Sequence, residues 1–187
     1  MEIKIRQETE QDINNVYEIN EKAFKQKEEA DLVNKLRSSP NFIKELSLVA
    51  EIHDDNKLMI TVGYLLFTKI PNIGIKPLNS NKDDDGDENM KCLALAPLSV
   101  LPNYQKKGIG KALIYEGLKK AKELGYRSVI VLGHEHYYEK FGFLPASQWS
   151  IECPFPLSNP NVFRCLELTY GALDHVSGVV DYSKEFY

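Results

Sequence analysis

The hydrophobic pattern of the first forty residues predicts one strand followed by two helices. Apolar and polar residues alternate over residues 3–7 (IKIRQ), which is the period of a strand. After Thr9 the apolar residues recur at helical spacing, and Thr9 with Asp12 three positions later resembles a capping box. The apolar face expected for this helix consists of Ile13, Val16, Tyr17, Ala23 and Phe24. A second helical pattern covers residues 28–37 and ends at a Ser-Ser-Pro breaker sequence.

The middle of the chain is dominated by β-rich segments. Residues 45–52 and 57–70 predict a hairpin, because only the turn-like sequence His-Asp-Asp-Asn separates them. Residues 71–91 combine Pro, Gly, Asn and Asp without any period, which indicates a long exposed loop. Residues 92–100 (CLALAPLSV) are almost wholly apolar, as in a strand covered on both faces. Pro97 has no amide hydrogen to donate to a neighbouring strand, so we expect a bulge or a break in pairing there.

The second half of the chain alternates helices and strands. A helix follows the glycines at 108 and 110 and ends at Gly125. Its expected buried face consists of Ile114, Gly117, Leu118, Ala121 and Leu124. Residues 128–133 (SVIVLG) predict a buried strand, residues 136–143 (HYYEKFGF) a short helix that turns into a strand, and residues 163–170 a late strand. The last dozen residues carry no clear pattern.

This order of elements predicts an α/β fold built on a mixed central sheet. We expect about six or seven strands flanked by helices, in a single domain over residues 1–187, because no segment has the composition of a linker. The core is expected at about residues 3–170. The acidic run at residues 78–90 is expected to be a flexible loop, and residues 171–187 a C-terminal extension.

Composition and charge narrow the class of protein. The chain has 187 residues, of which 43% are hydrophobic, and a formal net charge of −4, so it suits a globular domain that repels nucleic acid and anionic membrane surfaces. We therefore expect no nucleic-acid partner and no membrane partner. The opening sequence MEIKIRQETEQ lacks the apolar stretch of a secretory signal, and no apolar run reaches the ~18 residues of a membrane span. These features favour a cytoplasmic protein.

The cysteines fit neither a disulfide framework nor a zinc site. Cys92, Cys153 and Cys165 are odd in number and contain no CxxC spacing. We therefore expect all three to be reduced and to pack as small apolar groups in the core.

The acidic run matches a calcium-binding loop only in part. Asn81, Asp83, Asp85 and Gly86 occupy positions one, three, five and six of an EF-hand. Position twelve is Cys92, where a calcium loop carries a bidentate Glu, and no flanking helices are expected. The run therefore favours a solvated loop, and we expect no metal.

Residues 105–111 are rich in glycine and lysine and lie at the start of the helix that ends at Gly125. We call this segment the basic corner. The sequence LPNYQKKGIGKALI places two glycines and three lysines at a helix start, where free amides and the helix dipole attract anions. Gly108 and Gly110 let the backbone approach a phosphate closely. Gln105 can add a hydrogen bond, and the charged side chains within reach are Lys106, Lys107 and Lys111. The corner indicates a phosphate site; the alternative is a tight turn with solvated lysines.

Two nucleotide-binding motifs do not match this corner. A Walker loop has a Gly five residues before its Gly-Lys pair and Ser or Thr after it, whereas Gln105 and Ala112 stand at these positions. A dinucleotide fingerprint has a third glycine at the position of Leu113. The sequence therefore excludes both readings.

The same residues resemble motif A of the GCN5-related N-acetyltransferases, the GNAT superfamily. Its pattern is Gln or Arg, two residues, Gly, one residue, then Gly or Ala, which Gln105, Gly108 and Gly110 match. About thirty residues later, YYEKFGF resembles motif B, in which Tyr138 stands four residues before a Gly-Phe pair. The string VLGHEHYYEKFGF is similar to a YhbS-like branch of predicted acetyltransferases. The resemblance covers about residues 3–170.

The resemblance implies a GNAT fold and a cosubstrate, acetyl-CoA, whose acetyl group passes directly to a primary amine. In this fold the sheet is mostly antiparallel, and its fourth and fifth strands, here residues 92–100 and 128–133, splay apart around the cofactor. Backbone groups near Leu98, Ser99 and Val100 would then be free to bind it. The expected cofactor-binding residues are Leu98, Ser99, Val100, Gln105, Lys106, Lys107, Gly108, Ile109, Gly110, Lys111, Ala112 and His134.

The resemblance further implies that Tyr138 is the general acid for the leaving thiolate. The alternative is that Tyr137 and Tyr138 are both packing aromatics. The general base is open, and the candidates by residue type are Glu51, His134, Glu135 and His136. Many family members carry an Asn after the fifth strand that contacts the cofactor. The sequence GHEHYY has none, so that contact is absent or is replaced by His134.

The leading hypothesis is an acetyl-CoA-dependent N-acetyltransferase. The alternative is a non-catalytic module on the same fold that binds or senses acyl-CoA. A third class is an interaction protein that uses the acidic loop as its contact surface and binds no CoA. The acceptor stays open among small amines, amino acids, antibiotics and proteins, and the oligomeric state stays open between monomer and homodimer.

Overall fold

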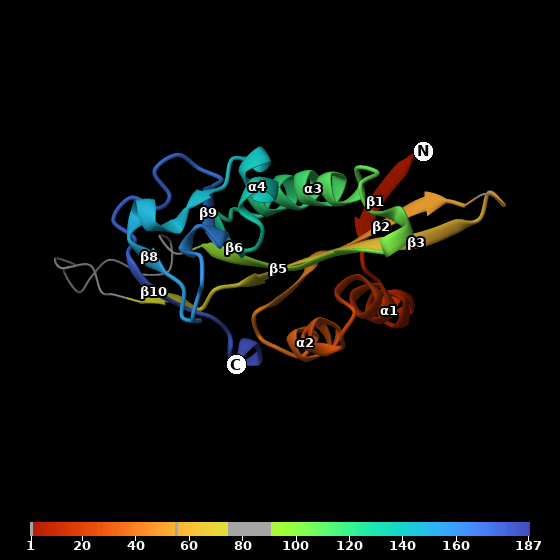
Figure 1. Ribbon diagram of the computed structural model, residues 1–187, viewed down its shortest axis with the longest axis horizontal. Helices are drawn as coiled ribbons and strands as arrows, with labels where there is room; N and C mark the ends of the chain where they lie inside the picture. The colour runs from red at the N-terminus through yellow and green to blue at the C-terminus, as the bar shows by residue number, and fades with distance from the viewer. Residues whose placement is uncertain (1, 55, 75–90) are drawn as a thin grey trace. The chain divides into compact units, whose positions relative to one another are not determined.

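The computed structural model describes residues 2–54, 56–74 and 91–187 (Figure 1). The strands are β1 (Ile3–Gln7), β2 (Phe42–His53), β3 (Met59–Lys69), β4 (Asn72–Gly74), β5 (Cys92–Val100), β6 (Ser128–Leu132), β7 (Leu144–Pro145), β8 (Ile151–Glu152), β9 (Phe163–Glu167) and β10 (Gly178–Asp181). The α-helices are α1 (Ile13–Phe24), α2 (Glu28–Arg37), α3 (Ile109–Glu123) and α4 (Glu135–Tyr138). The 3-10 helices are η1 (Glu10–Asp12), η2 (Pro102–Tyr104), η3 (Glu139–Phe141), η4 (Ala146–Trp149), η5 (Pro160–Val162) and η6 (Lys184–Phe186).

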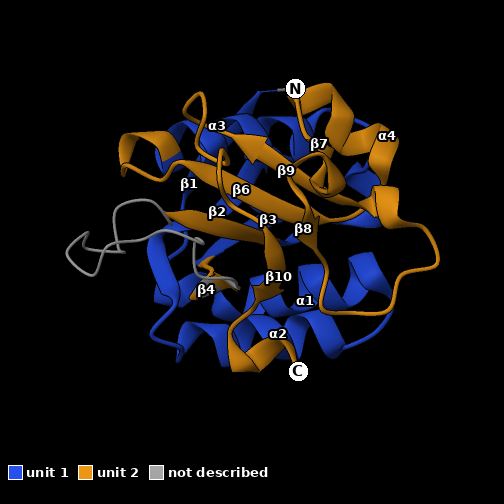
Figure 2. Ribbon diagram, turned by 90° about the vertical axis from the view of Figure 1, so that its left-hand side faces the viewer, with its two compact units in different colours: residues 1–68, 96–121 blue, residues 69–95, 122–187 orange. Residues whose placement is uncertain are grey.

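Contacts group the chain into two compact units. Unit 1 comprises residues 1–68 and 96–121, and unit 2 comprises residues 69–95 and 122–187 (Figure 2). Seven strands form one mixed sheet in the order β1-β2-β3-β5-β6-β9-β7. Strands β5 and β6 are parallel, and β1–β2, β2–β3, β6–β9 and β7–β9 are antiparallel pairs. The predicted mixed, mostly antiparallel sheet is therefore confirmed.

In unit 1 the predicted hairpin is formed by β2 and β3, and helices cover both faces of the strands. Helix α3 lies on one face, and α1 and α2 lie on the other (Figure 1). The predicted apolar face of α1 is partly wrong, because Val16, Ile19 and Asn20 are buried whereas Phe24 is 37% exposed. Phe24 is the last residue of α1, and Lys25 turns the chain into the left-handed region there.

Helix α3 approaches β3 at two glycines. A Cβ added to Gly63 would lie 2.9 Å from Cγ2 of Ile109, and one added to Gly117 would lie 2.5 Å from Cε2 of Phe67. Real Cβ atoms essentially never lie this close to a neighbour, so a side chain at either place would force the packing to shift. The burial predicted for Gly117 is confirmed, whereas Leu124 lies beyond the helix end and is 47% exposed.

A buried ion-pair cluster joins β1 to β2 and to the start of α1. Arg6 donates from Nη1 and Nη2 to the Asp12 carboxylate at 2.6 and 2.7 Å, and from Nε and Nη2 to Oε1 of Glu51 at 2.9 and 2.7 Å. The predicted capping interaction is present, because the amide of Thr9 donates to Oδ2 of Asp12 at 2.8 Å. The hydrogen bond from Arg6 lowers the pKa of Asp12 to about 2.

A second polar cluster joins α2 to the hairpin of β2 and β3. Arg37 of α2 pairs with Glu8, and the Ser47 hydroxyl bonds both Glu8 and, at 2.8 Å, the hydroxyl of Tyr64. Burial raises the pKa of Tyr64, whose side chain is inaccessible to solvent. Because a buried charge is stable only when it is paired, the cluster fixes α2 against the strands.

In unit 2, β6 pairs with Cys92–Leu95 of β5 on one side and with β9 on the other. The register with β6 ends at Leu95, although β5 continues to Val100. This agrees with the break in pairing that Pro97 predicted. The Ala96–Pro97 peptide bond is cis.

A second sheet in unit 2 corrects two sequence expectations. Residues 72–74, predicted as part of a loop, form β4, and the patternless C-terminal residues contribute β10. Strand β10 pairs antiparallel with β4 and parallel with β8. These strands have two to four residues each, so their pattern is too short to recognise alone. The predicted acidic loop at 78–90 lies outside the described residues.

The core of unit 2 contains two of the three cysteines. Cys92 and Cys165 are buried and burial raises the pKa of each thiol, to about 12 for Cys92. Cys153 is only half-buried, so the expectation that all three lie in the core is wrong for this residue. The buried guanidinium of Arg164 donates from Nε and Nη2 to the carbonyl of Phe143 at 3.2 and 2.8 Å.

We expect Asp12→Asn to lower the free energy of unfolding by about 1–2 kcal/mol at neutral pH. The pKa of Asp12 falls from 3.8 to about 2 on folding, so its stabilisation is complete above pH 3.8 and is lost as pH falls through about 2. Urea unfolding of wild type and variant at a series of pH values measures the difference, which should shrink toward the acid end.

The matched control is Asp181→Asn, which removes an exposed carboxylate from β10 and should change stability by only a few tenths of a kcal/mol. A difference between wild type and Asp12→Asn that stayed constant from neutral to strongly acid pH would contradict the ion-pair account.

Candidate functional site

The basic corner predicted from the sequence lies in unit 1, between the end of β5 and the start of α3. After η2 the chain enters the left-handed region at Lys106, with φ +61°, and again at Gly108, with φ +89°. The Gly108 carbonyl accepts the hydrogen bond from the Ala112 amide at 3.0 Å and so starts the helix. The amides of Ile109, Gly110 and Lys111 therefore belong to the first turn, where a helix offers them no acceptor.

The turn at residue 108 requires a glycine, and the space beside this glycine is open. A φ of +89° strains any residue with a side chain, and a Cβ built there meets no described atom within 4 Å. The backbone at Gly108 is thus exposed, with open space where a side chain would lie. Such backbone next to a helix N-terminus is suited to bind an anion.

The charges around the corner have one sign. The first turn of α3 contains no acidic residue, and the Lys106, Lys107 and Lys111 side chains are exposed. Nζ of Lys107 lies 5.1 Å from the centre of the Tyr104 ring, and Nζ of Lys111 lies 5.6 Å from the centre of the Tyr115 ring. Cation–π contacts leave the positive charge uncompensated, so the corner attracts anions.

Gln105 and the end of β5 complete this half of the site. Nε2 of Gln105 donates to the Val100 carbonyl at 3.0 Å, so the side chain holds the corner to β5. Ser99 is 3% exposed, and its Oγ has no hydrogen-bond partner in the described part of the chain. Leu98 and Val100 are half-buried. A hydroxyl group can both donate and accept a hydrogen bond, so Ser99 is a candidate contact for a ligand.

Tyr138 lies in unit 2, at the end of α4. Its ring packs edge-on against Tyr137 and Phe143, with centroids 5.3 and 5.6 Å apart. The side chain is 7% exposed, and burial raises its pKa above the ordinary value, with a smaller contribution from Tyr137. The hydroxyl is therefore a neutral proton donor at physiological pH.

Gly133, which the sequence analysis did not single out, shapes the surroundings of Tyr138. A Cβ at this position would lie 2.4 Å from Cε2 of Tyr138, so the ring occupies the space of the missing side chain. The Gly133 amide donates to the Val162 carbonyl at 2.9 Å, which anchors this loop to the residue before β9. A glycine directly after a buried strand was the only signal in the sequence.

The candidate general bases differ in their surroundings. His134 is exposed, and its carbonyl accepts the amides of Tyr137 and Tyr138 at 3.0 and 3.2 Å. His136 is 86% exposed and lies 3.3 Å from Oε1 of Glu135. Glu51 is bound to Arg6 in the buried ion-pair cluster. Because Arg6 occupies Oε1 of Glu51, this carboxylate already serves to join β1 to β2.

The predicted site residues thus gather at two places. Residues 98–112 form the corner in unit 1, and residues 133–138 form the tyrosine loop in unit 2. Among the described residues, no cluster of three His, Cys, Asp or Glu side chains could ligate a metal ion. None of the helices in the described ranges has both the length and the apolar content of a membrane span.

Comparison with known proteins gives consistent results. The sequence model of the Acetyltransferase (GNAT) family matches residues 13–143. The chain is 32% identical over 165 residues to Uncharacterized N-acetyltransferase YhbS of Escherichia coli (strain K12), which covers 88% of this chain and 87% of that protein.

Two solved structures share the fold over nearly the whole chain. The crystal structure of the GNAT family N-acetyltransferase YhbS from Escherichia coli in complex with CoA has a TM-score of 0.81 and 29% identity, covering 98% of this chain and 91% of that one. A GNAT family acetyltransferase from Brucella melitensis in complex with acetyl-CoA has a TM-score of 0.71 and 28% identity, covering 100% and 99%. With these matches and the family model over residues 13–143, the chain belongs to the GNAT acetyltransferase family.

Proposed function

We propose that this protein transfers the acetyl group of acetyl-CoA to a primary amine. The observation that carries the proposal is the corner at residues 105–111, a helix start with positive charge and open backbone in a chain of the GNAT family. Relatives at 29% and 28% identity were solved with CoA and acetyl-CoA, which supports the same cosubstrate here.

The residues of the corner fit the diphosphate of CoA. Gly108 leaves open the space that a Cβ would fill, so phosphate oxygens can approach the amides of the first helical turn. The ammonium groups of Lys106, Lys107 and Lys111 add charge without a competing carboxylate in that turn. The unpartnered Ser99 hydroxyl and the backbone of Leu98 and Val100 would hydrogen-bond the pantetheine and the thioester carbonyl.

Acetyl-CoA supplies an activated thioester, and the chain must position it, stabilise negative charge on the carbonyl oxygen and protonate the leaving thiolate. We assign the last role to Tyr138. Burial keeps its phenol protonated over the whole physiological pH range, so it needs no prior ionisation to act as an acid. The conjugate thiol of the leaving thiolate has a reference pKa of ~8.5, so the thiolate is a weaker base than a phenolate. Proton transfer from Tyr138 to the thiolate therefore depends on close geometry between the two groups.

The proton of the attacking ammonium must also be removed. Glu51 is engaged by Arg6, which leaves the exposed loop of His134, Glu135 and His136 as the nearest groups in sequence to Tyr138. An exposed imidazole can accept a proton through water. We therefore assign no direct contact between a base and the amine.

Amine-dependent release of CoA tests the function, and Tyr138→Phe tests the acid. The protein is mixed with acetyl-CoA and a panel of amines, and free thiol is followed with time. We expect turnover with at least one class of amine, and a loss of kcat on the order of 100-fold in Tyr138→Phe with CoA affinity unchanged.

Tyr137→Phe is the matched control, because this half-buried neighbour loses the same hydroxyl and should keep nearly full turnover. CoA binding without turnover across the whole panel would favour the alternative function, a module that senses acyl-CoA without catalysis.

Gly110→Glu tests the position of the diphosphate. The substitution puts a carboxylate into the first turn of α3, where it should repel the phosphates and weaken CoA binding at least 100-fold by calorimetry, with little change in unfolding temperature. Gly110→Ala adds bulk without charge and should retain most of the affinity. Unchanged CoA affinity in Gly110→Glu would place the cofactor elsewhere.

Gly133→Ala tests whether the glycine positions Tyr138. The added methyl group collides with the ring at 2.4 Å, so the ring must shift, and we expect kcat to fall roughly tenfold with KM for acetyl-CoA unchanged. In the Tyr138→Phe background the same substitution should cost no further activity, because the hydroxyl that it displaces is already gone.

Gly125→Ala is the control for a general loss of stability, because its φ of +82° strains any side chain whereas a Cβ there meets no described atom within 4 Å, so kcat should stay unchanged. If Gly133→Ala lowered activity equally in both backgrounds, its effect would be on folding and not on Tyr138.

A further inference from the structure

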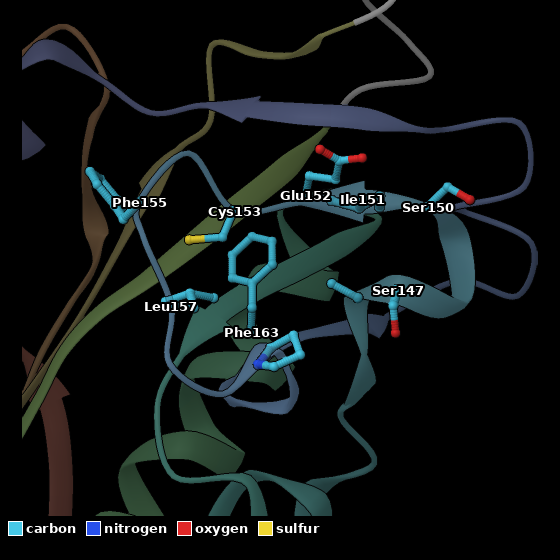
Figure 3. A pocket seen from close by; sticks show the side chains of 10 residues that line it. Ser147, Ser150, Ile151, Glu152, Cys153, Phe155, Leu157 and Phe163 are labelled. Atoms are coloured by element: carbon cyan, nitrogen blue, oxygen red, sulfur yellow. The ribbon is translucent and has the colours of Figure 1, made fainter.

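A cavity of about 380 Å³ lies in unit 2, apart from the residues assigned above (Figure 3). Its whole lining comes from residues 146–163, the segment that leaves β7, forms η4, β8 and η5, and returns as β9. Sequence analysis assigned nothing to most of this segment. The cavity is therefore a feature that only the folded chain reveals.

The lining combines apolar and polar surface, and the apolar share is the larger. Ile151, Cys153, Phe155, Leu157 and Phe163 contribute apolar surface to the lining. Among the described residues that line the cavity, Glu152 provides the one carboxylate, and there is no Lys or Arg. The lining therefore favours neutral or cationic molecules over anions. Figure 3 shows the Phe163 ring in the middle of the lining and the Glu152 carboxylate pointing away from it. An aromatic ring thus lies in the middle of the lining, and the negative charge lies at its border.

The size of the cavity sets the size of its occupant. An apolar cavity of about 150 Å³ is enough to bind benzene. A volume of about 380 Å³ therefore holds a phenyl or branched alkyl group together with a short chain. Pockets of this volume with apolar walls and few polar groups are typical small-molecule sites.

Hydrogen bonds inside unit 2 connect the cavity to the tyrosine loop. Phe163 pairs with Leu132, the last residue of β6, and the Gly133 amide bonds the Val162 carbonyl at 2.9 Å. Gly133 in turn packs against the ring of Tyr138. Phe163 in the cavity lining is therefore next in sequence to Val162, the residue that hydrogen-bonds Gly133 beside the proposed acid. This contact lies at the carboxyl end of the central strand β6.

We propose that this cavity binds the apolar part of the amine acceptor, which is then a primary amine with an aromatic or branched alkyl group. The inference rests on the proposed acetyl transfer, because it names the substrate class of that reaction. The apolar group enters between Phe163 and Leu157, and Glu152 at the border favours an acceptor that arrives as an ammonium ion and disfavours carboxylates.

The first test measures binding without catalysis. Calorimetry on the full chain with CoA compares 2-phenylethylamine, ethylamine and 3-phenylpropionate. Burial of a phenyl ring predicts that 2-phenylethylamine binds roughly 10–100-fold more tightly than ethylamine, and that 3-phenylpropionate binds no better than ethylamine. Equal binding of the two amines would overturn the inference.

The second test fills the cavity. Leu157→Trp puts a larger side chain into the lining and should weaken 2-phenylethylamine binding roughly tenfold or more, while CoA affinity stays unchanged. Leu124→Trp is the matched control, because Leu124 lies outside the lining and is 47% exposed. Equal affinities for 2-phenylethylamine in wild type and Leu157→Trp would overturn the inference.

Cys153 gives an independent readout that does not require a Trp variant to fold. Cys153 lines the cavity and is half-buried, whereas Cys92 and Cys165 are buried. Alkylation by iodoacetamide should therefore occur first at Cys153, and 2-phenylethylamine should slow it in proportion to occupancy while ethylamine at the same concentration should not. Alkylation at an unchanged rate under saturating 2-phenylethylamine would count against the cavity as its site.

Failure of the function and failure of the inference give different results. Acetylation of both amines with a kcat/KM that Leu157→Trp leaves unchanged would keep the proposed function and overturn the inference. Binding of 2-phenylethylamine that protects Cys153, without acetylation of any amine, would reject acetyl transfer and retain the cavity only as a ligand site, which overturns its role as acceptor pocket.

Discussion

The close approach of α3 to β3 is the constraint on which the proposed cofactor site depends. Gly63 and Gly117 remove side chains on opposite sides of that interface, and Ile109, Leu113, Leu65 and Phe67 fill the resulting space. Because a packed interface has few alternative arrangements, the axis of α3 is fixed, and with it the point where its first amides face outward. The corner before Ile109 thus obtains its direction from apolar packing two turns further along the helix.

The tyrosine loop of unit 2 also depends on a glycine that leaves space for a larger neighbouring side chain. The Tyr138 ring occupies the space left by the missing side chain of Gly133 and packs against Phe143. The carbonyl of Phe143 accepts hydrogen bonds from the buried guanidinium of Arg164, so a charged group in the interior holds the residue that packs against the Tyr138 ring. Burial then keeps the phenol protonated. Packing and acid–base behaviour therefore have one structural cause here.

Sequence reasoning succeeded where the signal is local. The strand at residues 3–7, the helices at 13–24 and 28–37 and the glycine-rich helix start all follow from spacing and capping, and the mixed sheet follows from their order. It failed where structure depends on distant partners: β4 and β10 pair across about a hundred residues, and the contact of Gly133 with Tyr138 needs the loop geometry. The exposure of Phe24 and Leu124 reflects helix ends, which periodicity locates poorly.

The contacts of Lys107 and Lys111 with aromatic rings have a consequence for the behaviour of the corner in solution. A lysine held by a carboxylate would present a neutral pair to an approaching anion, whereas a lysine held over a tyrosine ring keeps its full charge and loses part of its motion. Attraction at the corner is therefore long-ranged, and dissolved ions screen it over about 8 Å at physiological ionic strength. The capture of a polyanion by this protein should thus be fast in dilute buffer and slow in concentrated salt.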